Sequence, residues 1–78
     1  MDVVKVFKKE DFRNFKTEDV NLKTLGIELN INYTVLLVVS NKLFKGFYIV
    51  GDNVPQEVLS KYIEKSEKLG FNRYINWV

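Results

Sequence analysis

The chain of 78 residues contains neither cysteine nor histidine. Without cysteine there is no disulfide framework, no thiolate zinc site and no cysteine nucleophile. Without histidine the chain lacks the most common general base, the most common metal ligand and the side chain that titrates near neutral pH. Its four glycines are scattered and form no phosphate-binding loop, and its serines have no histidine partner. We therefore expect a protein that is not an enzyme and that uses no cofactor and no metal.

Long apolar runs and targeting signals are also missing. No run approaches the roughly 20 apolar residues of a membrane-spanning helix. The first residues, Met1, Asp2 and Val3, do not open like a signal peptide. A small secreted domain usually relies on disulfides, which this chain cannot form. These absences predict a soluble, cytoplasmic protein that does not act at a membrane.

Charge of one sign is not concentrated anywhere. Twelve basic and ten acidic residues give a formal net charge of +2. Both signs are mixed along the whole chain, which disfavours nucleic acid as the partner. The hydrophobic fraction of 46% is enough for a packed core, and a chain of this length makes a single domain, 1–78.

One long helix is predicted near the C-terminus, over about residues 54–69. Asn53 is placed to cap it and Gln56 completes a capping-box pattern. Pro55 fits the first turn, and Gly70 supplies a left-handed stop. The apolar residues in between recur at helical spacing, which predicts one buried face.

The middle of the chain predicts strands. Tyr33–Ser40 and Leu43–Val50 are rich in β-branched and aromatic residues, with Asn41 and Lys42 as a compact hairpin connection. Upstream, apolar and polar residues alternate from Leu25 to Tyr33, which predicts a strand whose polar face is in water. Because the two segments together would exceed the usual strand length, we expect a turn near residues 30–32 or a sharp bend.

The two ends of the chain complete the predicted fold. We expect a short strand at Val3–Phe7 and a last strand within Asn72–Val78. Lys8–Lys23 is expected to form one or two short helical pieces, the second capped by Thr17 and ending at Gly26. The fold class is therefore α+β, a small two-layer sandwich with a mostly antiparallel sheet of four to five strands, one long C-terminal helix and a short N-terminal helical segment.

The two central strands are apolar on both faces, which one long helix cannot cover. Val35–Val39 has no polar residue, and strict alternation in Leu43–Val50 places three apolar residues on each face: Leu43, Phe47 and Ile49 opposite Phe44, Tyr48 and Val50. Three candidates remain open for the second face. They are the N-terminal segment with Phe12 and Phe15, a second copy of the chain, and a different partner.

The segment Lys45–Val50 resembles in part the first signature of RNA-recognition-motif domains, with its basic residue, glycine and aromatic residue in succession. The resemblance implies that Phe47 stacks on a base, that Lys45 lies near a phosphate and that Phe7 is a first-strand aromatic. The sequence departs from the signature in three places. Tyr48 replaces a small residue, Ile49 replaces the second stacking ring, and Asp52 replaces a further aromatic.

The function that the sequence favours is a small non-enzymatic protein-binding module. It would self-associate, with a homodimer as the favoured state, or would inhibit or sequester a protein partner, in the manner of a phage or viral accessory protein. The candidate partner-binding residues are Lys42, Phe44, Lys45, Phe47 and Ile49. The alternative is a single-stranded nucleic-acid binder that stacks bases on the sheet aromatics as an RNA-recognition motif does.

Overall fold

The computed structural model describes residues 4–68 together with the backbone of 75–77. The predicted helix stop at Gly70 and the first part of the predicted C-terminal strand lie outside these residues. Seven elements follow along the chain: β1 (Val4–Phe7), α1 (Lys9–Arg13), β2 (Leu22–Leu29), β3 (Thr34–Ser40), β4 (Leu43–Val50), α2 (Gln56–Lys68) and β5 (Ile75–Trp77).

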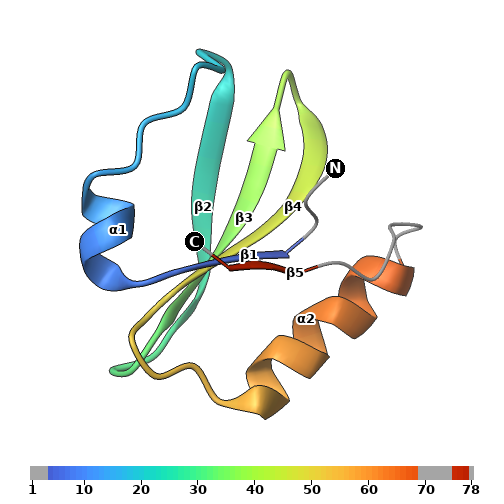
Figure 1. The fold of residues 1–78 in the computed structure, drawn as a ribbon. Coiled ribbons are helices and arrows are strands. Elements are labelled where there is room, and N and C mark those ends of the chain that lie inside the picture. The colour runs from blue at the N-terminus through green and yellow to red at the C-terminus, as the bar shows by residue number, and fades with distance from the viewer. Residues whose placement is uncertain (1–3, 69–74, 78) are drawn as a thin grey trace.

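The described strands form one sheet in the order β2-β3-β4-β1-β5 (Figure 1). β2, β3 and β4 pair antiparallel, and these two long ladders contain most of the paired residues. β1 lies parallel to both of its neighbours, β4 and β5. The predicted α+β fold, with a mostly antiparallel sheet and a long C-terminal helix, is confirmed. The helix α2 supplies the crossover that parallel strands require.

The core lies between the sheet and α2. On this side, which we call the α2 face of the sheet, residues of β1, β3 and β4 pack against three buried residues of the helix. The sheet residues are Val4, Val6, Val35, Phe47 and Ile49, and the helix residues are Val58, Leu59 and Tyr62. Each of these side chains is at most 9% exposed, so this contact supplies most of the buried apolar area of the fold.

The opposite side, which we call the α1 face, is covered in part by the N-terminal segment. Figure 1 shows α1 and α2 on opposite sides of the sheet. The ring centroid of Phe7 lies 5.2 Å from that of Phe12, 5.0 Å from that of Phe15 and 5.1 Å from that of Tyr48. Of the three candidates for covering the second face, the segment with Phe12 and Phe15 therefore covers its β1–β4 part. Phe7 meets the other three rings edge to face, the arrangement that aromatic quadrupoles favour, while the rings of Phe12 and Phe15 are nearly parallel to each other.

Two boundaries differ from those predicted. The long helix begins at Gln56, because the carbonyl of Pro55 accepts the first helical hydrogen bonds, from the N–H groups of Val58 at 3.0 Å and Leu59 at 3.3 Å. Asn53 thus lies two residues before the capping position, and the prediction that it caps the helix is wrong. The second N-terminal helical piece is also wrong. Thr17 accepts a hydrogen bond from the N–H of Asp19 at 3.1 Å in a local turn.

The segment that follows this turn is a strand. Residues 22–26 belong to β2, where pairing with β3 overrides the local helical preference. The turn predicted at residues 30–32 is confirmed, because Asn30 donates its N–H to the carbonyl of Tyr33 at 2.9 Å and β3 starts at the next residue.

A bulge in β4 changes which side chains share a face. The register with β3 shifts between Val38 and Val39, next to Gly46, whose φ of 140° is a conformation that residues with a side chain rarely adopt. Strict alternation would separate Phe44 from Phe47. The extra residue instead brings Phe44 to the α2 face, where its ring centroid lies 5.2 Å from that of Phe47.

Candidate partner-binding surface

Two of the predicted partner-binding residues lie in the core. Phe47 is 4% exposed and Ile49 is fully buried. The Phe47 ring centroid lies 4.9 Å from that of Tyr62 on α2. Neither side chain offers surface to a partner, so their assignment as contact residues is wrong. The base-stacking role that the family resemblance implies for Phe47 is excluded for the same reason.

The other three predicted residues do not form one site. Lys42 is exposed in the β3–β4 turn, where Asn41 and Lys42 adopt φ values of 52° and 65°. Phe44 packs on Phe47 on the α2 face. Lys45 lines a hollow on the α1 face. Neighbouring residues of a strand point to opposite sides of the sheet, so Phe44 and Lys45 lie apart. The bulge in β4 decides which of the two shares the face of Phe47, and strict alternation would place Lys45 there instead of Phe44.

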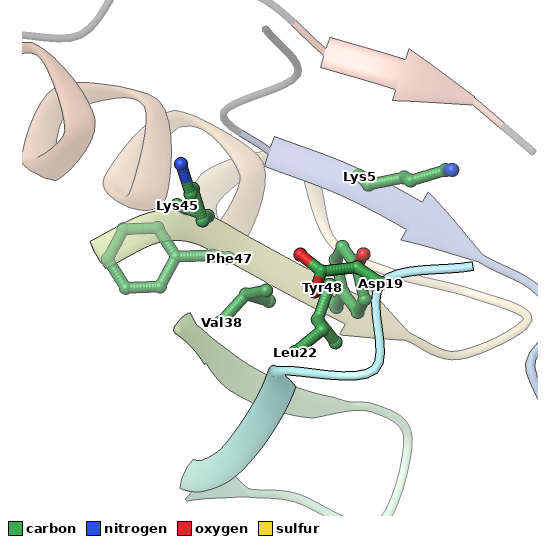
Figure 2. A pocket seen from close by; sticks show the side chains of 8 residues that line it. Lys5, Asp19, Leu22, Val38, Lys45, Phe47 and Tyr48 are labelled. Atoms are coloured by element: carbon green, nitrogen blue, oxygen red, sulfur yellow. The ribbon is translucent and has the colours of Figure 1, made fainter. Parts of the chain in front are cut away.

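The hollow on the α1 face has a volume of about 210 Å³ and is bordered by Lys5, Asp19, Lys45 and Tyr48. Figure 2 shows that the ammonium groups of Lys5 and Lys45 point away from each other. The Nζ of Lys5 lies 5.4 Å from the ring centroid of Phe7 and 5.2 Å from that of Phe15. The two cations therefore do not converge on a common anion, and the hollow has no built phosphate site.

The most exposed apolar surface follows β2 and the turn after it. Leu25 is 62% exposed, Ile27 42%, Leu29 80% and Ile31 90%. The alternation in this segment predicted a strand whose polar residues face water. The structure shows the reverse for Glu28, which is partly buried against α2 while its aliphatic neighbours are exposed. The cause is a register shift between Gly26 and Glu28, since one extra residue exchanges the two faces.

Glu28 fixes the end of β2 to the rest of the fold. Its Oε2 accepts a hydrogen bond from the hydroxyl of Tyr33 at 2.5 Å. Its Oε1 accepts from the hydroxyl of Tyr62 at 2.6 Å and from Nζ of Lys61 at 2.8 Å. The hydrogen bonds from Lys61, Tyr33 and Tyr62 lower the pKa of Glu28 to about 2. Burial and the Glu28 carboxylate raise the pKa of Tyr62, and hydrogen bonding to the same carboxylate raises that of Tyr33.

Asp19 fixes the beginning of β2 on the other face. One carboxylate oxygen accepts a hydrogen bond from the hydroxyl of Ser40 on β3, and the other accepts from the N–H of Asn21 at 2.9 Å. These two hydrogen bonds, aided by the charge of Lys45, lower the pKa of Asp19. β2 is thus held at both ends, on opposite faces of the sheet, and its outer edge is pre-formed.

Comparison with known proteins gives no further information. No family model, no curated protein and no solved structure matches this chain. Among residues 4–68 and 75–77, no group of acidic side chains could hold a metal ion. The helices of the same residues include none long and apolar enough to cross a membrane.

Sequence reasoning missed β2 as the candidate surface. Leu25 and Leu29 stood in an alternating pattern that usually marks the buried face of an edge strand. The available signal was Gly26 within that pattern, because a glycine inside a strand often marks a bulge. A bulge at this point inverts the faces beyond it, and with them the set of residues that a partner would meet.

Proposed function

We propose that this protein is a non-enzymatic protein-binding module that receives a strand of its partner along the outer edge of β2. The observation that carries the proposal is the combination of an edge position, eight residues of strand and exposed aliphatic side chains in one element. Protein modules commonly bind extended segments in this way, with backbone hydrogen bonds for affinity and side-chain contacts for specificity.

The free edge of β2 supports this use because an unpaired edge strand is a template for pairing with another chain. An edge strand presents a row of unpaired N–H and C=O groups, and folded proteins usually shorten, cover or charge such strands. β2 is eight residues long and is not covered on its outer side by any described residue, and its protection is limited to one lysine, Lys23, and one bulge. Single exposed aliphatic residues are normal on a protein surface, whereas several of them in one edge strand and the turn after it, on both sides of the sheet, favour a binding surface.

A photo-crosslinking experiment in cells tests the proposal. A photoreactive amino acid replaces Leu25 on the edge in one variant and Leu43 in the β3–β4 hairpin in the other. The two leucines are matched, with exposures of 62% and 63%. We expect a protein adduct from position 25 and none from position 43. The absence of any protein adduct at position 25, or an adduct with nucleic acid alone, would overturn the proposal.

A further inference from the structure

We infer that the strand received at the edge of β2 is β2 of a second copy, paired antiparallel about a twofold axis through Leu25. This inference rests on the proposed function, because it names the partner of the same surface. Two copies related in this way share one continuous sheet, and α2 of each lies on the same side of it. The contact is isologous, so the same residues serve on both subunits and the assembly closes as a dimer.

The faces of β2 can be assigned residue by residue from its register with β3. Lys23, Leu25 and Glu28 are opposite Val39, Leu37 and Val35, which lie on the α2 face. Leu22, Thr24 and Leu29 are opposite Ser40, Val38 and Thr34 and lie on the α1 face. Ile27 is the extra residue of the bulge. Any strand that pairs with the outer edge must match this order, because side chains directly opposite each other share a face.

With a twofold axis through Leu25, every pair of directly opposite residues lies on the same face of the sheet. Leu25 meets Leu25 of the second copy on the α2 face, and Thr24 meets Gly26 on the α1 face. Beyond Gly26 of the second copy, Ile27 is the unpaired residue of the bulge. The residue of the second copy that lies opposite Lys23 is therefore Glu28. Both lie on the α2 face, and the pair places opposite charges across the two strands. Finally, Leu22 meets Leu29 on the α1 face.

The same features disfavour other partners. A bulge and a lysine on an edge strand are devices that discourage pairing with an arbitrary strand. A register shifted by one pair in one direction would set Lys23 opposite Leu25, and a shift in the other direction would set Glu28 opposite Leu25. A strand that pairs in this register must carry an acidic residue opposite Lys23 and a basic residue opposite Glu28, and the second copy supplies both by symmetry.

Sedimentation of the purified protein over a wide range of concentration tests the inference. We expect a reversible dimer of twice the 9.2 kDa chain mass, with a dissociation constant on the order of micromolar, because an edge-to-edge contact is small. Leu25→Lys sets two lysines against each other on the axis and is expected to give a monomer. Leu43→Lys is the control with matched exposure and is expected to dimerise as the parent does. Circular dichroism checks that both variants fold.

Single cysteines test the register, since the chain has none of its own. Directly opposed residues of antiparallel strands have Cα atoms about 4.5 to 5.5 Å apart, within the range of a disulfide. Leu25→Cys is therefore expected to form a covalent dimer on mild oxidation. Thr24→Cys lies diagonal to its own copy and on the other face, and it is expected to remain largely unlinked.

Three outcomes would overturn the inference. They are a monomer at all concentrations, a dimer that Leu25→Lys leaves intact, and a dimer that links through Thr24→Cys in preference to Leu25→Cys. The proposed function fails separately. If the purified protein is monomeric but position 25 crosslinks to a different protein in cells, the edge is a binding surface and only the identity of its partner is wrong.

Discussion

β2 and β4 are two strands of equal length with opposite surroundings. Each has eight residues, each contains one glycine and each has a bulge next to that glycine. In β4, Phe47 and Ile49 are in the core, whereas in β2 no residue is fully buried. β4 has a strand on either side and α2 on one face, while β2 has a single neighbour in the described sheet. Position in the sheet, and not composition, decides which aliphatic side chains build the core and which remain available to a partner.

The largest effect on stability is expected when one aliphatic side chain is removed from each strand. Ile49 is fully buried and Leu29 is 80% exposed. We expect Ile49→Ala to reduce the free energy of unfolding by roughly 2 to 5 kcal/mol, because it leaves a cavity in the core. Leu29→Ala should change it by less than about 0.5 kcal/mol. Urea denaturation at low protein concentration, where self-association does not contribute, measures both. Similar losses in the two variants would contradict the contrast between the strands.

The two glycines give the second test. Gly46 has a φ of 140°, so Gly46→Ala forces an unfavourable backbone conformation, and we expect it to cost about 1 to 3 kcal/mol. At Gly26, an added Cβ would meet only the end of the Leu29 side chain, at an ordinary 3.5 Å. Gly26→Ala is therefore expected to be neutral or to stabilise by about 0.5 to 1 kcal/mol. Thermal unfolding of the two variants measures both changes in stability. Equal destabilisation would show that the two bulges are equivalent.

Acid should loosen β2 while β4 keeps its packing. Hydrogen bonding lowers the folded-state pKa of Glu28 from 4.5 to about 2. The contribution of this carboxylate to stability is therefore present above the unfolded-state pKa and is lost as the pH falls from about 4.5 towards 2. Because Glu28 and Lys61 are partly exposed, we expect a loss of only about 1 to 2 kcal/mol. Stability measured against pH checks this. Glu28→Gln should flatten this part of the curve, and an unchanged acid slope would exclude Glu28 as its source.

The sequence predicted well those elements whose local pattern and tertiary position agree. Residues 34–40 and 43–50 form strands as the β-branched and aromatic residues indicated, and α2 lies within the predicted 54–69. The second N-terminal helix failed because pairing of residues 22–26 with β3 outweighs a weak local preference. The coverage of the second face by Phe12 and Phe15 was one of three open alternatives, since the aromatic contacts with Phe7 join segments that composition alone cannot place together.

The candidate surface could not be predicted because two bulges change the side-chain alternation on which the prediction depended. In β4 the bulge brings Phe44 to the face of Phe47, and in β2 it turns Glu28 towards α2. A shift of one residue reverses every face beyond it. The position of a bulge depends on pairing between strands, which a single sequence shows only through an occasional glycine such as Gly26 or Gly46.

The smallest expected effect concerns the turn that joins β3 to β4. Asn41 and Lys42 both have positive φ values, the conformation of a two-residue hairpin turn that matches the twist of its strands. Lysine at the second position holds this conformation at a cost that glycine does not have. We expect Lys42→Gly to raise the free energy of unfolding by about 0.5 to 1 kcal/mol. Asn41 already suits its place, so Asn41→Gly should gain less. Because this turn is remote from the edge of β2, Lys42→Gly should leave the association of the protein unchanged, and sedimentation beside urea denaturation would separate the two properties. A change in association without a change in stability would mean that Lys42, and not the edge of β2, contacts the partner.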